Sequence, residues 1–348
     1  MALDIHEAFQ GIASDERFIQ DTREIVQSRL SEQNTSDLFT IVPGIKGGQQ
    51  VAAMKGIEYV TTADEGCGGA SLSPTFPAIS QKWNPKLCKV KIKYCFADFK
   101  NFFTQWALGN GYDIKKLDEA DFFSFIVDFV EQAMRMDMQR VALFGDENIS
   151  TQNILNDTNK VKFYDLIGKG LIPTLQYFKT IESLQDNFVA LDLNSNPDQF
   201  TMAEDYAKNI YKKVIDNDFF DTNQLLSSNS LYKNYEDLIE GNVRYLESNK
   251  IDIQKGLPTL SIRGQQITRV KHYDRWRNND FKKDGVTHLP HFALAANKEH
   301  LQIGVDSESV LNDLVFEYIG GDDEHFYIKG NYMMDFKMVN PFEFKAAI

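Results

Sequence analysis

The last third of the chain is a succession of short β-prone segments separated by turn residues. Residues 292–296, 301–306, 314–319 and 325–329 are the first four; Gly320-Gly321 follows the third and Gly330-Asn331 the fourth. In the last segment, 332–339, apolar and polar side chains alternate with the period of two that indicates one buried sheet face. Hairpin reversals need positive φ, which glycine adopts without steric cost. This pattern predicts an antiparallel sheet with a turn at Gly330-Asn331, and the sheet offers no reactive residue.

Composition sets the scale of the fold. With 348 residues, of which 43% are hydrophobic and 25% charged, the chain predicts two compact lobes plus extensions. No run of about 18 apolar residues is present, and the first residues lack a signal-peptide pattern, so we expect cytoplasmic expression without a membrane span. A formal net charge of −13 argues against a protein that clamps nucleic acid by its phosphates. Cys67, Cys88 and Cys95 form no C-x-x-C pair and predict free thiols.

Two N-terminal segments cannot form a core by themselves. Residues 1–37 are polar and helix-prone, with few apolar positions, and predict an arm that docks on another surface. Residues 38–87 are rich in glycine and proline, which interrupt short strand-like pieces. Such a long segment predicts an extended hairpin or loop that projects from the body.

The clearest single strand is 88–94, where three lysines alternate with apolar residues and so share one face. They are Lys89, Lys91 and Lys93. A solvated sheet face is the simplest interpretation. A more specific interpretation is that this basic face contacts an acidic surface of a neighbouring subunit. A third interpretation is direct contact with nucleic acid.

Helical periodicity follows this strand. Residues 97–108 predict one helix, and 118–144 a much longer one, capped by Asp118 and ended by Gly145. Such a helix would be about 40 Å long. Methionines near its end predict core packing rather than a cofactor contact. They are Met134, Met136 and Met138.

Further elements are not in regular βα alternation. Residues 201–204 form a capping box that predicts a helix over 202–215, and residues 230–246 predict another. Strands return over 256–270 around Gly264. The fold class predicted from this order is α+β.

The search for chemistry gives no catalytic, cofactor-binding or metal-binding residue. No dinucleotide or phosphate-binding glycine motif is present, and Cys67 in its glycine turn lacks a partner base. His288, His291 and His300 are spaced as scattered loop residues, because Pro290 breaks any helical arrangement. The protein is therefore not expected to be an enzyme.

The basic and aromatic stretch 269–283 is the other candidate surface. It could stack single-stranded nucleic acid, but in an acidic chain a subunit-contact loop is the better interpretation, since arginine and tryptophan anchor many interfaces. The candidate contacts here are Arg275, Trp276 and Arg277.

The order of elements resembles that of the tailed-bacteriophage major capsid proteins, the Hong Kong 97-like fold. Residues 117–145 resemble the spine helix of that family, and the lysine-bearing strand before it resembles the base of the extended loop. Residues 226–235 and 260–264 resemble parts of the axial domain. Residues 297–306 are similar to a recurrent segment, with His300-Leu301 where the family often has asparagine-leucine.

This resemblance implies a division of the chain and a function. The implied parts are an N-terminal arm (1–37), an extended loop (38–96), a peripheral domain (97–195) with its spine helix at 118–144, an axial domain (196–305) and a peripheral C-terminal sheet (306–348). It also implies self-assembly into pentamers and hexamers of an icosahedral shell around double-stranded DNA, which is packaged without sequence-specific contact. A scaffolding protein, a portal and head-decoration proteins are implied partners, and assembly in the host cytoplasm would end in the virion capsid. Lysines of the extended loop belong to no motif for covalent cross-linking.

Two alternative functions follow from the same residues. An encapsulin-like shell would share the fold and hold a protein cargo. A cytoplasmic enzyme or binding protein of another α+β fold would stay a monomer or dimer.

Overall fold

The computed structural model describes most of the chain, and every structural statement below concerns these residues. They are 35–55, 78–95, 119–149, 157–191, 203–215, 224–240, 251–252, 257–258, 260–283, 286–305, 315–319 and 325–348. Residues 1–34 of the predicted arm, the predicted helix 97–108, Asp118 and Cys67 lie outside this set.

The first sheet is built around one long strand, β16 (His325–Met338). Strand β4 (Lys86–Cys95) pairs antiparallel along one edge of β16, from Cys95 opposite His325 to Lys86 opposite Met334. The other edge pairs with β15 (Val315–Ile319) near its start and with β14 (Leu301–Val305) near its end. Strand β1 (Thr40–Pro43) lies parallel to β14 and completes the sheet.

The predicted alternation in the C-terminal segment is confirmed, but the predicted turn is wrong. Tyr332, Met334, Phe336 and Met338 are all buried in the larger core. The chain does not reverse at Gly330; it continues as strand and pairs with Val90 of β4. Pairing with β4 on both sides of this position keeps the backbone extended, and a glycine inside a strand then marks close packing rather than a turn.

The second sheet has six strands in the order β5-β17-β13-β6-β10-β9. Their bounds are Phe188–Val189, Phe344–Ala347, Ala293–Ala296, Gln224–Ser228, Gln265–Val270 and Ser261–Ile262. The strands predicted around Gly264 are confirmed: β9 and β10 form a hairpin whose two turn residues, Arg263 and Gly264, have φ of 51° and 81°. Positive φ at both positions suits the right-handed twist of the flanking strands.

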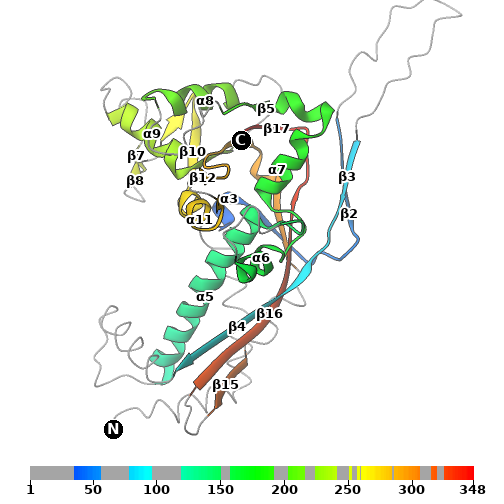
Figure 1. Ribbon diagram of the computed structural model, residues 1–348, viewed down its shortest axis with the longest axis vertical. Coiled ribbons are helices and arrows are strands. Elements are labelled where there is room, and N and C mark those ends of the chain that lie inside the picture. The colour runs from blue at the N-terminus through cyan, green and yellow to red at the C-terminus, as the bar shows by residue number, and fades with distance from the viewer. Residues whose placement is uncertain are drawn as a thin grey trace, which may run out of the picture.

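Two hydrophobic cores meet at this second sheet, in agreement with two lobes. Along β13, Leu294 and Ala296 belong to the larger core, whereas Ala293 and Ala295 belong to the smaller one. Because successive side chains of a strand point to opposite faces, the sheet separates the two cores. Helices α8 (Tyr206–Ile215) and α9 (Asn229–Glu240) cover its smaller-core face (Figure 1).

The long helix is confirmed as α5, Glu119–Phe144. Its 26 residues span about 39 Å. Residues at spacings of three and four face the larger core, and they include Met134 and Met138, so the core interpretation of these methionines is also confirmed. They are Val130, Met134, Met138 and Val141.

The helix ends at Phe144, and the next residue, Gly145, lies where no side chain fits. A Cβ atom on Gly145 would lie 2.4 Å from Cγ1 of Ile167 and 2.7 Å from the carbonyl oxygen of Val141. The residue is therefore required by packing, not by positive φ.

Shorter helices complete the lobes, and one predicted start is wrong. α6 (Thr158–Tyr164) and α7 (Leu171–Lys179) follow α5, and η2 (Glu182–Asn187) leads into β5. The capping box at 201–204 does not open α8, which begins at Tyr206; Asp205 instead accepts a side-chain hydrogen bond from Asn209 at 3.0 Å. Helix α9 begins one residue before its predicted start and is described to Glu240.

The α+β class is confirmed, and two strands pair outside the part of the chain to which the resemblance assigns them. β14 was expected with residues 196–305 but pairs in the first sheet with β1 and β16. β17 was expected with the terminal sheet but pairs with β13 and β5 in the second. Both strands are short and largely buried, and the sequence pattern of such a strand does not reveal its partner.

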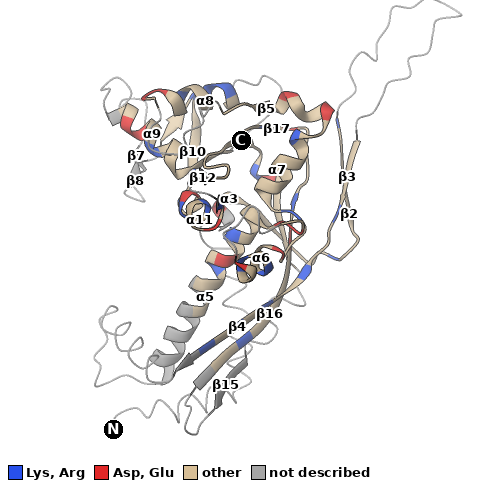
Figure 2. Ribbon diagram, viewed as in Figure 1, with Lys and Arg blue, Asp and Glu red and all other residues tan. Residues whose placement is uncertain are grey.

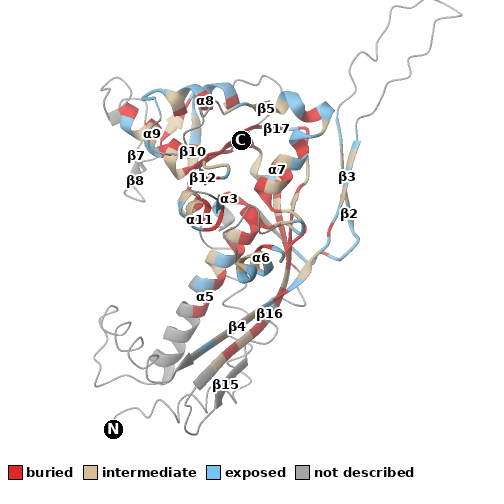
Figure 3. Ribbon diagram, in the orientation of Figure 1, coloured by how far each residue is buried: buried red, intermediate tan, exposed pale blue. Residues whose placement is uncertain are grey.

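A two-stranded hairpin projects from the body, as Figure 1 shows. It consists of β2 (Gln50–Met54) and β3 (Ala78–Lys82), paired antiparallel, and its residues alternate between exposed and half-buried (Figure 3). β1 and β4, at the two ends of the predicted loop 38–96, belong to the first sheet.

Small elements complete the described structure. The minor pairs are β7 (Ile251–Asp252) with β8 (Leu257–Pro258) and β11 (Lys282–Lys283) with β12 (Val286–Thr287). Short helices are α3 (Thr35–Leu38), η3 (Lys298–His300) and α11 (Tyr273–Asp280). None of the helices within the described ranges has the length and hydropathy needed to cross a membrane.

Candidate subunit-contact surfaces

The three lysines of β4 form an exposed basic face, called here the lysine face. Lys89, Lys91 and Lys93 are all exposed, whereas Cys88 on the opposite side of the strand is buried. Figure 2 shows these positive residues along β4 and the neighbouring part of β16. No carboxylate of the described residues lies within ion-pair distance of the three ammonium groups.

Cross-strand neighbours increase the positive charge of the lysine face. Lys91 is directly opposite Lys329 of β16, and Lys93 is opposite Tyr327. The ammonium groups of Lys91, Lys93 and Lys329 lie 5.8, 5.7 and 5.4 Å from the centre of the Tyr327 ring. Like charges placed opposite each other destabilise a strand pair, and the ring face offsets part of this.

The second predicted surface, the contact loop at residues 269–283, is largely helical and buried in the structure. Residues 273–280 form α11 rather than a loop, and only Arg275 of the three candidate residues is exposed. Trp276 and Arg277 keep 6% and 3% of their surface accessible and pack in the larger core, with the Arg277 guanidinium 4.5 Å from the Phe144 ring centre. Their burial within one subunit corrects the prediction that they are surface anchors.

At the last residue of α11, a buried carboxylate joins three elements. Asp280 accepts a 2.6 Å hydrogen bond from the Tyr164 hydroxyl and pairs with Lys160 at 3.1 Å and with Arg140 of α5. Sequence reasoning missed this cluster. A local signal was available only in the spacing of Lys160 and Tyr164, which are four residues apart on one face of a helix.

The base of the projecting hairpin is fixed by a second buried carboxylate. Asp335 of β16 is fully buried and forms an ion pair with Lys337 at 2.8 Å. It also accepts backbone hydrogen bonds from Asn84, at 2.8 Å, and from Phe336, at 2.9 Å. Since Asn84 lies two residues after the end of the hairpin, this carboxylate ties the hairpin to the sheet.

Close packing reinforces the same junction. Opposite Asp335 in β14 lies Gly304, where an added Cβ would be 2.6 Å from Ile45 and 2.7 Å from the Trp83 ring. Trp83 and Ile45 are both buried at 3% exposure. Backbone hydrogen bonds from Gly48 to Trp83 and from Trp83 to Gln49 close the hairpin at this point. The hairpin therefore leaves the body in a defined direction.

A serine, a histidine and an aspartate meet near the start of α9 without forming a catalytic triad. The Ser230 hydroxyl lies 2.6 Å from Nδ1 of His291 and 3.4 Å from the Asp274 carboxylate. Because Asp274 contacts the serine instead of orienting the histidine, the relay needed for a nucleophile is absent. Burial lowers the pKa of His291 to about 4 and raises that of Asp274 to about 6. The cluster joins α9 and α11 to the segment that leads into β13.

The remaining predicted groups are dispersed. His288 is exposed, and His300 lies 3.7 Å from Glu343 near the start of β17. The Cys88 thiol is buried, which raises its pKa to about 11. Within the described ranges, no three histidine, cysteine or acidic side chains are grouped as a metal ion requires.

Comparison with known proteins gives a whole-chain likeness in structure. No protein-family model matches the sequence, and no curated protein matches it. A chain of the satellite phage P4 procapsid, solved with its size determination (Sid) protein, is similar over 93% of this chain and 98% of that one, with 12% identity and a TM-score of 0.50. The chain therefore has a fold found in a phage procapsid.

Other similar solved structures come from further phages. The capsid of Myoviridae phage XM1 matches over 91% of each chain, with 10% identity and a TM-score of 0.44. A structure of Mycobacterium phage Ogopogo covers 90% of this chain and 91% of its own, with 14% identity and a TM-score of 0.45.

Proposed function

We propose that this chain is the major capsid protein of a tailed phage, with the Hong Kong 97-like form of the fold. Copies would assemble into pentamers and hexamers of an icosahedral shell around double-stranded DNA, a structural rather than an enzymatic role. The observation that carries the proposal is the likeness to a phage P4 procapsid chain, which extends over nearly the full length of both chains.

The shape of the subunit supports this proposal independently. The hairpin β2–β3 projects from the body with exposed residues on both strands, including Met54 at 63% exposure. Ordering each residue of such a projection costs about 1–2 kcal/mol, and an isolated subunit recovers little of it by burial. In a closed symmetric lattice the same residues become interface.

The contacts between copies are proposed at the lysine face and at Arg275. Lys89, Lys91 and Lys93 would meet an acidic surface of a neighbouring subunit, and Arg275 would contribute at a second place. Direct contact of the lysine face with nucleic acid is less favoured, because the chain as a whole carries a net charge of −13.

Further partners are part of the same proposal. A scaffolding protein, a portal and head-decoration proteins would accompany assembly, which would take place in the host cytoplasm and end in the virion capsid. Packaged DNA would be held without sequence-specific contact, since an acidic wall does not bind phosphates tightly.

Electron microscopy of the purified full-length chain tests the proposal. We expect closed particles or capsomers in negative stain, alone or after co-expression with the proteins encoded beside it. A chain that stays monomeric or dimeric at all concentrations under both conditions would contradict the proposal and favour a different α+β protein. Particles from infected cells that hold a protein cargo and no DNA would instead support an encapsulin-like shell.

A further inference from the structure

The lysine face carries exposed apolar side chains as well as ammonium groups. Leu87 of β4 points to the same side of the strand as the three lysines, is 61% exposed, and lies opposite the half-buried Met333 of β16. The half-buried ring of Tyr327 lies among the ammonium groups. A segment that covers this face therefore needs carboxylates together with apolar side chains.

The part of the chain before the described residues has this combination in its sequence. Residues 1–34, called here the arm segment, carry an excess of negative side-chain charge and contain no lysine. The acidic residues are Asp4, Glu7, Asp15, Glu16, Asp21, Glu24 and Glu32, and the basic ones are Arg17, Arg23 and Arg29. Phe18 and Ile25 lie among them in the sequence. The arm segment thus complements the lysine face in charge and in apolar character.

The arm segment is tethered within reach of the lysine face of its own subunit. It leads into α3, which is fixed by a 2.6 Å hydrogen bond from the side chain of Gln224 to the carbonyl oxygen of Asp37. The next strand, β1, is an edge strand of the sheet that contains β4 and β16. Along β16, Lys337 is level with β1 and Lys329 with Lys91, eight residues or about 27 Å apart. A segment of 34 residues spans about 50 Å even when wholly helical, so it is long enough to pass round the sheet edge.

We infer that, in the unassembled subunit, the arm segment of the same chain covers the lysine face. A tethered segment has an effective concentration on the order of millimolar, far above that of other subunits in dilute solution. The tether therefore favours the arm segment of the same chain over any surface of a second copy. The inference goes beyond the proposed function, because in a shell the acidic surface of a neighbouring subunit would displace the arm segment from this face.

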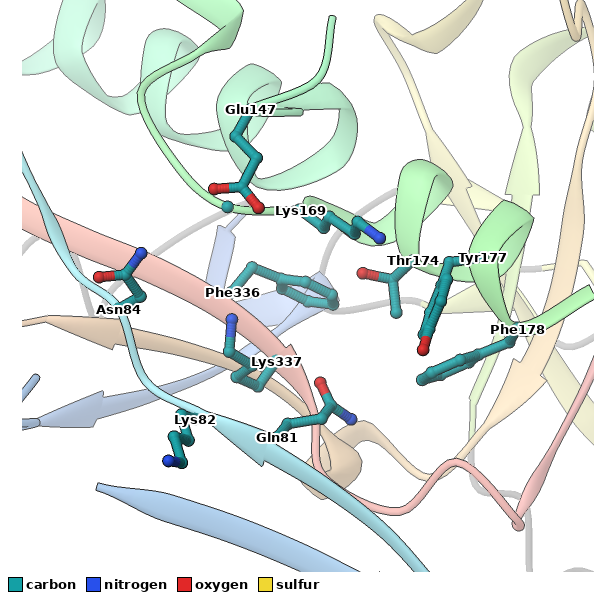
Figure 4. A pocket seen from close by; sticks show the side chains of 11 residues that line it. Gln81, Lys82, Asn84, Glu147, Lys169, Thr174, Tyr177, Phe178, Phe336 and Lys337 are labelled. Atoms are coloured by element: carbon teal, nitrogen blue, oxygen red, sulfur yellow. The ribbon is translucent and has the colours of Figure 1, made fainter. Parts of the chain in front are cut away.

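A surface pocket of about 210 Å³ beside the hairpin base also contains lysines, but it is a poorer site for an acidic segment (Figure 4). Lys337 in its wall is already in an ion pair at 2.8 Å. The side chain of Lys82 points away from the pocket, whereas Gln81 faces it. Lys169 and Glu147 contribute one positive and one negative charge. Because little uncompensated positive charge converges there, the lysine face is the better acceptor.

Lysine acetylation of the unassembled subunit tests the inference. The full-length chain, at low salt and below the concentration at which particles form, is acetylated briefly, and mass spectrometry gives the rate at each lysine. A full-length variant neutralises four acidic residues of the arm segment: Asp15→Asn, Glu16→Gln, Asp21→Asn and Glu24→Gln. We expect the lysines of the lysine face to react about threefold faster or more in this variant. In about 0.5 M salt the difference should disappear, because salt screens exposed charges.

A control variant carries the same change of charge on exposed acidic residues outside the arm segment. Its substitutions are Glu182→Gln, Asp186→Asn, Glu204→Gln and Asp237→Asn. It should leave the rates at the lysine face unchanged, and the exposed Lys212 and Lys213 of α8 should react equally in the unmodified chain and the arm variant. Equal rates at the lysine face in the unmodified chain and the arm variant would overturn the inference. An equal acceleration in the control variant would also overturn it.

Zero-length cross-linking identifies which segment covers the lysines. A dilute mixture of ¹⁵N-labelled and unlabelled chains is treated with a carbodiimide, which joins a lysine to a carboxylate in direct contact. We expect pairs between the lysine face and the arm segment, and each pair should carry a single isotope. Mixed-isotope pairs, pairs with the acidic residues 322–324 alone, or protection of the lysines that nuclease treatment removes would overturn the inference. Failure of the unmodified chain to form particles would overturn only the proposed function.

Discussion

The ion pair at the hairpin base gives a quantitative prediction. In Asp335→Asn the side chain keeps its shape but loses its charge and one of its two acceptor oxygens. Three donors converge on the carboxylate: the ammonium of Lys337 and the backbone N–H groups of Asn84 and Phe336. An amide that faces Asn84 and Lys337 with its oxygen turns its NH₂ group toward the Phe336 N–H, so one backbone donor stays unsatisfied.

The expected cost follows from this geometry. An unsatisfied buried donor costs about 1–3 kcal/mol, and a buried charge without its partner brings the total to roughly 3–5 kcal/mol. Asp335 is fully buried and the side chain of Lys337 is 11% exposed, so solvent screens the pair little. We therefore expect Asp335→Asn to lower the free energy of unfolding of the unassembled subunit by about 3–5 kcal/mol.

Urea unfolding followed by tryptophan fluorescence measures this loss, and the double variant Asp335→Asn with Lys337→Met is the control. Removing the ammonium as well should restore about 2 kcal/mol or more, because replacing both partners of a buried pair is often nearly neutral. Hydrogen exchange at the Phe336 amide, which loses its acceptor, should accelerate in the single variant. A loss of less than about 1 kcal/mol in Asp335→Asn would refute the role given to this ion pair. So would a loss in the double variant equal to the sum of the losses in Asp335→Asn and Lys337→Met.

Three further predictions address other sites. Gly304→Ala should lower the free energy of unfolding by about 1–3 kcal/mol in urea melts because its Cβ has no room, whereas Gly47→Ala, which meets no atom within 4 Å, should not. Folding lowers the pKa of His291 to about 4, so this residue adds stability above pH 6.5 that is lost as the pH falls toward 4. From pH 7 to pH 4, the free energy of unfolding of His291→Gln should therefore rise by up to about 3 kcal/mol relative to that of the unmodified chain. A difference between the two chains that stays constant with pH would contradict this. Asp274, with its raised pKa, gives the opposite slope between pH 6 and 4, so the unmodified chain should show little net change from this cluster. Cys88, buried and with a raised pKa, should resist a maleimide at neutral pH until urea is added, as read by peptide mass spectrometry, and fast labelling of the folded chain would show that the strand opens.

The features that were predictable from sequence are those with a local periodic signal. The long helix, the alternation from Tyr332 to Met338 and the lysine-bearing strand each follow from spacing along one segment. Both the helix and the strand bury one face, and the residues of that face recur at a fixed spacing within one short segment of sequence.

The features that were missed depend on partners distant in sequence. The sequence around Gly330 is typical of a turn, but in the structure this residue pairs with β4. The sequence around Asp335 is typical of a solvent-facing residue, but in the structure its carboxylate accepts a hydrogen bond from the backbone of Asn84. Arginine is a residue type common in interfaces, but the aromatic side chains that surround Arg277 place it in the core.

The position of β17 has a consequence for how the protein is made. Strand β13 pairs with β17 on one edge, so the second sheet is incomplete until residues 344–347 have emerged from the ribosome. Each residue pair along this edge joins positions about fifty apart in the chain, and such long connections slow folding. A nascent chain therefore lacks part of both cores during most of its synthesis. In the proposed assembly, partly translated chains would therefore be excluded, because their second sheet is incomplete.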